Sequence, residues 1–269
     1  MKSIKRVIAN ILLLMIASCM LVPFVYMIIT SLKVTYTAYN FDISLSKLTI
    51  QNYVDILTKQ NFLRYFLNSC IVVFGGVVIN VFFSSLAGFA FAKKDFPGNN
   101  KIFFIYLVTL MIPSQVTMIP LYIIMRKLHW INDFRALILP ITTAFGVFLM
   151  RQAIMKIPDD LIDSARIDGC SDLRIFFQIV LPLIKPAIIT LTIFTFIGAW
   201  NEFLWPLIMT TNDSVRTLTL GLATMKAHYT INYGLIMAGT TLTFLPSFLI
   251  YILLQKKFVQ GVTLSGMKG

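Results

Sequence analysis

Long apolar runs constrain the fold of this chain more than any other feature of its sequence. Six of them read as membrane spans, at about residues 7–32, 65–92, 102–125, 136–150, 187–209 and 233–254. A run of ~20 apolar residues is long enough to cross the hydrocarbon core of a bilayer as a helix. The chain is 58% hydrophobic and only 13% charged, which leaves too little polar surface to coat a globule. The sequence therefore predicts an all-α, polytopic membrane protein with six transmembrane helices in a single domain, residues 1–269.

The basic residues between the spans predict an orientation. If both termini face the cytoplasm, the inner segments hold 14 Lys and Arg residues and the outer segments hold 9. An excess on the inner side follows the positive-inside rule. The formal charge of +12 is scattered over short segments and forms no basic stripe, so nucleic acid is not an expected partner.

The first apolar run has a second interpretation. A basic start, an apolar core and the letters "IASC" ending at Cys19 resemble a lipoprotein signal with its modified cysteine. The apolar run continues well past Cys19, which favours a membrane span.

Two spans contain residues that affect how helices pack or bend. Ser84, Gly88 and Ala92 recur every four residues, a stripe of small side chains that lets two membrane helices approach closely. Pro113 and Pro120 lie inside the third run and predict a bent or unwound helix. That bend either lines a cavity or serves packing alone.

Residues 157–186 form a charged and strongly patterned segment between two apolar runs. Pro158 suits the start of a helix, and the two aspartates after it place negative charge at the positive end of the helix dipole. Gly169 supplies the left-handed conformation in which many helices end, so we expect a helix of about three turns. Ser171 can cap a second helix that continues until Pro182 interrupts it.

The first of these helices has the pattern of an amphipathic helix that docks in a groove. Leu161 and Ala165 fall four residues apart on one face, with Asp163 and Arg166 beside them. A short amphipathic helix of this kind normally needs a complementary groove on a partner. The plainer alternative is a well-capped loop with no partner.

The same segment resembles a known family. Permease subunits of binding-protein-dependent ABC importers carry a motif written EAA, three residues, G, nine residues, I, one residue, LP. The corresponding positions here are Asp163, Ser164, Ala165, Gly169, Ile179, Leu181 and Pro182. The spacing is met throughout, although Asp replaces Glu and Ser replaces the first Ala. The strings "IPDDLIDSARIDG", "WNEFLWPLI" (200–208) and "KKFVQGVTLSGMKG" (256–269) are similar to the carbohydrate branch, and to the second maltose-type permease subunit in particular.

The resemblance implies the transmembrane domain of a type I ABC importer in the bacterial cell membrane. Its expected partners are membrane lipid, a second permease subunit, two ATPase subunits and an extracytoplasmic sugar-binding protein. Residues 157–186 would be the cytoplasmic coupling loop. Leu161, Asp163, Ser164, Ala165 and Gly169 would contact an ATPase subunit, which would use the ATP.

The sequence contains no catalytic machinery of its own. The string "GVTLSGMK" (261–268) has Met267 where a phosphate-binding loop requires Lys, and His129 and His228 have no ligand partners at useful spacing. We therefore expect a non-catalytic subunit with no cofactor and no metal. One alternative is a secondary transporter or channel, which would need more acidic residues within its membrane spans. Another is a membrane-bound enzyme or scaffold, against which stands the lack of any set of catalytic residues.

A polar group in the fifth run provides a candidate substrate path. Trp200, Asn201 and Glu202 offer an aromatic face, an amide and a carboxylate, the groups with which proteins recognise sugars, and an acid within a membrane span is costly. Glu202 could instead pair with the neighbouring subunit or reach the outer interface. The sequence does not identify the sugar, which could be an oligosaccharide, another glycoside or glycerol phosphate.

Overall fold

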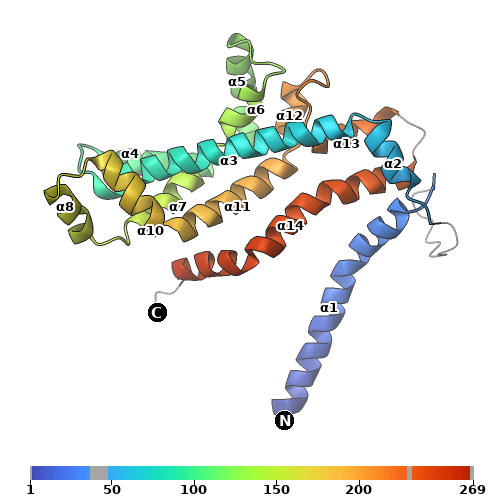
Figure 1. Ribbon diagram of the computed structural model, residues 1–269, viewed down its shortest axis with the longest axis horizontal. Coiled ribbons are helices and arrows are strands. Elements are labelled where there is room, and N and C mark those ends of the chain that lie inside the picture. Colours follow the sequence, from blue (N-terminus) through green and yellow to red (C-terminus); the bar gives the residue numbers. More distant parts are fainter. Residues whose placement is uncertain (1, 37–47, 229–231, 267–269) are drawn as a thin grey trace. The chain divides into compact units, whose positions relative to one another are not determined.

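The structure is a computed structural model that describes residues 2–36, 48–228 and 232–266 (Figure 1). Every regular element in these ranges is a helix. The longer helices are α1 (Lys2–Ser31), α3 (Phe62–Lys93), α4 (Asn99–Val108), α5 (Ser114–Lys127), α7 (Ala144–Ile154), α11 (Lys185–Asn201), α13 (Leu218–His228) and α14 (Tyr233–Gly266). The shorter ones are α2 (Gln51–Thr58), η2 (Thr109–Met111), α6 (Phe134–Ile138), η3 (Leu139–Ile141), α8 (Asp159–Ile167), α9 (Asp172–Ile175), η4 (Phe176–Val180), α10 (Leu181–Leu183) and α12 (Leu204–Met209).

Six segments have the length and composition of membrane spans. Helices at 5–31, 62–93 and 233–253 are each long and apolar enough on their own. Three further segments reach that length only as bent pairs: α4–η2 with α5, α6–η3 with α7, and α9–η4–α10 with α11, bent by 103°, 42° and 79°. The all-α, polytopic class predicted from the sequence is therefore confirmed, with three such helices, or up to six spans if each bent pair is counted as one.

Contacts between residues divide the chain into two units, residues 1–64 with 221–246, and residues 65–220 with 247–269. In the first unit, α1 is a continuous helix that passes through Cys19, and only 6% of its apolar window is buried. An apolar helix exposed on all sides is stable only in lipid or against another protein. The short helix α2 belongs to the same unit and buries Asn52 and Ile56.

A buried amide joins α2 to the end of α1 within this first unit. Asn52 Nδ2 donates to the backbone oxygens of Ser31 at 2.9 Å and Lys33 at 2.8 Å, and the Ser31 and Tyr53 hydroxyls lie 2.6 Å apart. These bonds satisfy carbonyl groups left free at the end of α1.

The second unit contains α3 and the three broken pairs. The break in the third run falls at Pro113, which precedes α5 and lacks the N–H that would continue the helix. Pro120, predicted to bend the same run, lies inside α5 instead. The fourth run breaks at Thr142 and Thr143, where Thr143 caps α7 through its hydroxyl.

The fifth run differs from its predicted bounds of 187–209. Its helix α11 begins at Lys185 and ends at Asn201, and a separate short helix, α12, follows from Leu204. Pro182 does not interrupt the preceding helix as predicted. A wider π-helical turn, η4, comes just before it. The shifted hydrogen bonds of such a turn accommodate a proline, which has no backbone N–H to donate.

Two apolar clusters form the core of this unit. One lies around Phe89 of α3 and Met150 of α7 and includes residues of α8, η4 and α11. The other lies around Val72 of α3 and joins α5, α6 and α12. Gly88 permits the close approach of α3 to α7, because a Cβ atom there would lie 2.8 Å from the backbone nitrogen of Arg151. The predicted small-residue stripe therefore does bring two helices together.

Candidate functional site

Helix α8 is built by local signals that the sequence makes visible. It begins at Asp159, one residue later than expected, with Pro158 as its N-cap and two aspartates in its first turn. Gly169 has a φ of +78°, the left-handed conformation predicted for it, and nothing lies within 4 Å of a Cβ atom placed there. The Ser171 hydroxyl accepts the Arg174 N–H at 3.4 Å, which confirms the predicted cap of the next helix.

The two faces of α8 have different environments. Ile162 and Ala165 are buried and pack in the core cluster around Phe89 and Met150. The opposite face, which we call the outward face, consists of Asp160, Asp163, Ser164 and Ile167, all exposed. Ile167 is 87% exposed, an unusual position for an isoleucine within a charged helix.

This arrangement separates the residues predicted to contact a partner. Asp163 and Ser164 lie on the outward face, and Gly169 is exposed at the end of the helix. Leu161 lies at the edge of the face and borders a cavity of about 370 Å³ next to Pro158 and Ile184. Ala165 faces inward, so its predicted seat in a partner's cleft does not fit the structure. Its small side chain instead lets α8 sit close to the core.

The predicted substrate path falls at the break between α11 and α12. Asn201 is exposed, and its side chain donates to the backbone oxygen of Ile197 at 2.8 Å. Glu202 is exposed, and its Oε1 accepts the backbone N–H of Trp205 at 3.2 Å, which caps α12. The carboxylate therefore lies at the end of a broken helix and not within a continuous span.

Trp200 lies inside the protein. Its ring stacks on Phe196 at 5.5 Å and meets Phe66 edge to face at 5.8 Å, and only 3% of the residue is exposed. No ring face is free for a sugar, so the substrate contact predicted for Trp200 does not fit the structure. Trp205 is also buried, and its indole N–H donates to the backbone oxygen of Ala136 at 2.8 Å.

Glu202 does line a cavity of about 430 Å³ within the second unit. Its wall is largely apolar, with the exposed rings of Phe145 and Phe194 in edge contact at 5.6 Å. The polar groups on the wall are the side chains of Asn80, Ser114, Thr117, Thr143, Thr195, Glu202 and Thr217. A mainly apolar cavity with a few polar groups is typical of a small-molecule site.

Asn80 is the polar centre of this wall and is almost fully buried. Its Nδ2 donates to Thr195 Oγ1 on α11 at 2.8 Å. Its Oδ1 accepts the Ser84 hydroxyl at 3.0 Å and the Thr143 backbone N–H at 3.1 Å. One amide thus joins α3, α11 and the start of α7, and it satisfies a backbone donor exposed by the broken helix.

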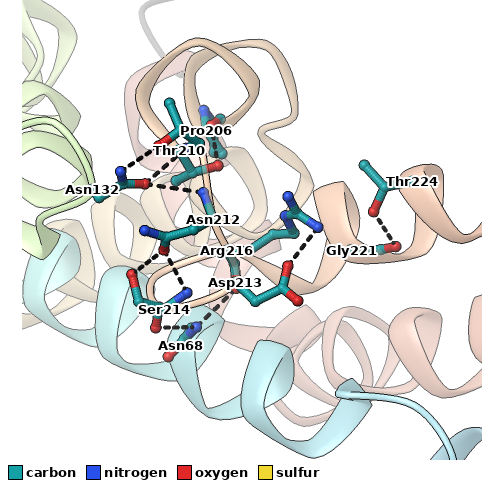
Figure 2. A network of polar contacts seen from close by, with 11 residues as sticks. Asn68, Asn132, Pro206, Thr210, Asn212, Asp213, Ser214, Arg216, Gly221 and Thr224 are labelled. Atoms are coloured by element: carbon teal, nitrogen blue, oxygen red, sulfur yellow. Dashed lines mark hydrogen bonds and ion pairs between the residues drawn. The ribbon is translucent and has the colours of Figure 1, made fainter.

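A second polar network holds the loop that follows α12 (Figure 2). The Asn132 side chain accepts the Thr211 N–H at 2.7 Å and donates to its hydroxyl at 2.5 Å. On the other side, Asn68 of α3 donates to the backbone oxygens of Ser214 at 3.1 Å and Arg216 at 2.9 Å. The loop is therefore tied to α3 and to the turn before α6.

The neighbouring Asp133 is ionised over the ordinary pH range. Hydrogen bonds from the Arg135 side chain, and then from its backbone N–H, lower the pKa of the Asp133 carboxyl. A carboxyl whose pKa is lower in the folded state stabilises the fold at pH values above its unfolded-state pKa. This stabilisation is lost as the pH falls through its folded-state pKa.

No group of three or more His, Cys, Asp or Glu that could hold a metal occurs among residues 2–36, 48–228 and 232–266.

The structure aligns with a chain of a crystal structure of a bacterial ABC transporter involved in the import of the acidic polysaccharide alginate. The TM-score is 0.84 at 23% identity, with coverage of 95% of this chain and 96% of that one. Residues 80–264 match the family described as the binding-protein-dependent transport system inner membrane component. The chain belongs to this family and is a membrane-embedded permease.

Two relatives align with most of its length. An arabinooligosaccharides transport system permease protein of Bacillus subtilis is 34% identical over 273 residues, covering 99% of this chain and 97% of the relative. A protein of the same description from Halalkalibacterium halodurans is 39% identical over 226 residues, covering 83% of this chain and 81% of the relative. The resemblance inferred from the 157–186 segment is thereby confirmed.

Two residues of these sites were not singled out from the sequence. The sequence placed Ile167 within a predicted helix and Asn80 within a predicted span. A polar Asn within an apolar run is itself a signal, because a buried amide needs partners. Ile167 could have been found as an apolar residue among acids on the face opposite Ile162.

Replacing Glu202 by glutamine should separate its two roles. Glutamine keeps an acceptor for the Trp205 N–H, so we expect the unfolding temperature of the purified protein to stay unchanged. The charge on the cavity wall is lost, so selectivity between neutral and anionic substrates should shift. A control, Glu202→Leu, removes the cap as well and should lower stability by about 1 kcal/mol. Unchanged selectivity in Glu202→Gln would assign the carboxylate to helix capping alone.

Proposed function

We propose that this chain is a permease subunit of an ATP-driven bacterial importer that translocates a sugar or oligosaccharide. The substrate is delivered by an extracytoplasmic binding protein. A second permease subunit completes the path, and two ATPase subunits hydrolyse the ATP, so this chain itself catalyses no reaction. Both termini and α8 face the cytoplasm, in agreement with the excess of Lys and Arg on that side.

The observation that carries the proposal is the division of α8 into an anchored face and an outward face. Ile162 and Ala165 fasten the helix to the core of its own subunit, while Ile167 is left exposed among the carboxylates of Asp160 and Asp163. A helix that docks in a groove needs an apolar anchor on its free face and a rigid attachment on the other. Docking on an ATPase subunit supplies the missing cover for Ile167.

Closure of the ATPase subunits on ATP then moves α8, which is attached to its own subunit through Ile162 and Ala165. Helices packed at the density of protein interiors shift as bodies and do not absorb displacement. The helices are interrupted at Pro113, Thr142 and Glu202. At these positions the angle between two consecutive helices can change while few backbone hydrogen bonds are broken. The 430 Å³ cavity borders all three breaks and would change shape with them.

A carbohydrate substrate is supported by the relatives and by the cavity wall. The permeases of Bacillus subtilis and Halalkalibacterium halodurans are described as serving arabinooligosaccharide transport. On the cavity wall, the hydroxyls of Thr117 and Thr195 and the carboxylate of Glu202 can bond sugar hydroxyls, and the rings of Phe145 and Phe194 can pack on the apolar face of a sugar.

The test is transport by the reconstituted complex. The chain is produced with its neighbouring transport subunits, purified through a tag on this chain and placed in proteoliposomes that contain ATP. We expect ATPase subunits to copurify, and uptake of labelled arabinooligosaccharides to require the binding protein and to stop with vanadate. sn-Glycerol 3-phosphate serves as the competing substrate. Uptake driven by an ion gradient without ATP would refute the proposal.

A further inference from the structure

Residues 157–172, which we call the α8 segment, include α8 and the turn that follows it. Charged side chains bind both ends of this segment to the last turn of α3. Lys93 Nζ donates to the backbone oxygen of Ile157 at 2.5 Å and to Asp159 Oδ1 at 2.6 Å, just where α8 begins. Lys94 pairs with Asp172, at the start of α9. Between these points the Arg166 guanidinium donates to the backbone oxygen of Lys93 at 3.5 Å. These polar bonds all lead from the α8 segment to one turn of one helix.

Lys93 differs from the other charges in this group because it is buried. Its side chain is 4% exposed, whereas that of Asp159 is 79% exposed. A buried ammonium must be fully partnered, and here a carbonyl, a carboxylate and the negative end of the α3 dipole surround it. Exposed pairs such as Arg166 with Asp163 contribute little by comparison. The ammonium of Lys93 therefore sets the position of α8 relative to α3.

Helix α3 is suited to carry a displacement over a long distance. Its 32 residues form one helix of about 48 Å without a break (Figure 1). Asn80 joins its middle to the cavity wall, as described above. At its far end Asn68 holds the loop at 214–216, and the Ser69 hydroxyl accepts the backbone N–H of Leu218 at 2.8 Å.

The covalent route from α8 to its following span is less direct. Between α8 and α11 lie the turn at Gly169, the π-helical η4 and a bend of 79° at Ile184. Each is a place where the backbone departs from a regular helix and can absorb motion. The bonds from Lys93 to Ile157 and Asp159 connect α3 directly to the start of α8 and bypass all of them.

We propose that Lys93 is the positioning residue that makes α3, and through it the cavity wall and the 210–218 loop, move with α8. This inference rests on the proposed function, in which an ATPase subunit moves α8. It assigns to one buried ammonium the transfer of that movement into the longest unbroken helix of the second unit. Helix α11, which is joined covalently to the segment, receives its movement through the peptide chain and not through Lys93.

The test compares reporters on two helices in the assembled transporter. In a background with Cys19, Cys70 and Cys170 replaced by serine, a single cysteine at Phe74 on α3 or at Ile197 on α11 carries an environment-sensitive fluorophore. Both positions are exposed, so labelling leaves the core intact. ATP added to the wild-type complex should change the emission of both reporters.

Lys93→Met keeps the length of the side chain and removes its charge. We expect the α3 response to ATP to fall by about fivefold or more, with the α11 response largely kept and the same amount of ATPase copurified. Asp159→Asn leaves the Ile157 carbonyl as a partner for Lys93 and should give an intermediate loss. Lys93→Met with Asp159→Asn should be no worse than Lys93→Met alone. Lys101→Met, an exposed lysine on α4, is the matched control and should behave as wild type.

The possible outcomes distinguish a failure of the proposed function from a failure of the role inferred for Lys93. An ATP response absent from both reporters in the wild-type complex would overturn the proposed function and this inference with it. A normal wild-type response that Lys93→Met leaves unchanged at Phe74 would overturn the inference alone. Equal loss at both reporters would also overturn it, because Lys93 would then support the whole unit and not α3. If Lys93→Met does not assemble, the response of Asp159→Asn at Phe74 decides, since that carboxylate is exposed.

Discussion

Replacing Ile167 by aspartate should abolish transport while leaving the isolated subunit folded. Ile167 is 87% exposed and contributes little to its own fold, so its substitution should change stability by no more than about 0.5 kcal/mol. In an apolar groove of an ATPase subunit the new carboxylate would lose its hydration without gaining a partner. A loss of about 3 kcal/mol, typical of an interface anchor, corresponds to a roughly hundredfold weaker complex.

The measurement is the amount of ATPase subunit that copurifies with the tagged chain, together with ATP-dependent uptake. Ile50→Asp provides the control, because Ile50 is also an exposed isoleucine, at 69%, and lies at the start of α2 outside the α8 segment. It should copurify normal amounts of ATPase. If Ile167→Asp does the same and transports normally, the outward face of α8 is not the docking surface.

Replacing Gly88 by leucine should cause the largest loss of stability. A Cβ atom at Gly88 would lie 2.8 Å from both the Arg151 backbone nitrogen and Met150 Cβ, and a backbone atom cannot move aside as a side chain can. The variant must force α3 and α7 apart, at about 3 kcal/mol, the upper range for overpacking. In a domain of this size that corresponds to a fall in unfolding temperature of roughly 6 to 12 °C.

The unfolding temperature of the purified protein in detergent, followed by intrinsic fluorescence, checks this prediction. Gly198→Ala is the matched control, because Gly198 is also a glycine within a helix and nothing lies within 4 Å of an added Cβ atom. Alanine there should raise stability by about 0.5 to 1 kcal/mol through its higher helix propensity. Equal temperatures for the two variants would show that the close contact at Gly88 does not constrain the packing.

Features set by local chemistry could be predicted from the sequence. The end of α8 at Gly169 requires a left-handed residue, and the cap at Ser171 requires a hydroxyl next to free backbone N–H groups. Both features depend on residues that are close together along the chain, so the amino-acid sequence is enough to predict them. The break at Pro113 follows in the same way from a missing N–H.

Features set by packing could not be predicted. Leu161 and Ala165 are four residues apart and share a helical face by spacing, yet the core selects the face centred on Ile162 and buries Ala165 with it. Trp200 is next to Asn201 and Glu202 in the chain, but the rings of Phe196 and Phe66 enclose it. Periodicity shows that a helix has two faces, and only its neighbours decide which one is buried.

The sequence by itself therefore determined the class of the protein, its long apolar runs and the bounds of the short charged helix α8, because hydropathy and local capping depend on residues close together in the chain. Tertiary structure decided that Ile167 faces outward, that Asn80 joins three helices, and that Lys93 is buried at the base of α8. These positions follow from contacts between residues as far as 115 apart, such as Asn80 with Thr195. A buried polar group finds its partners only when the helices that carry them have packed together.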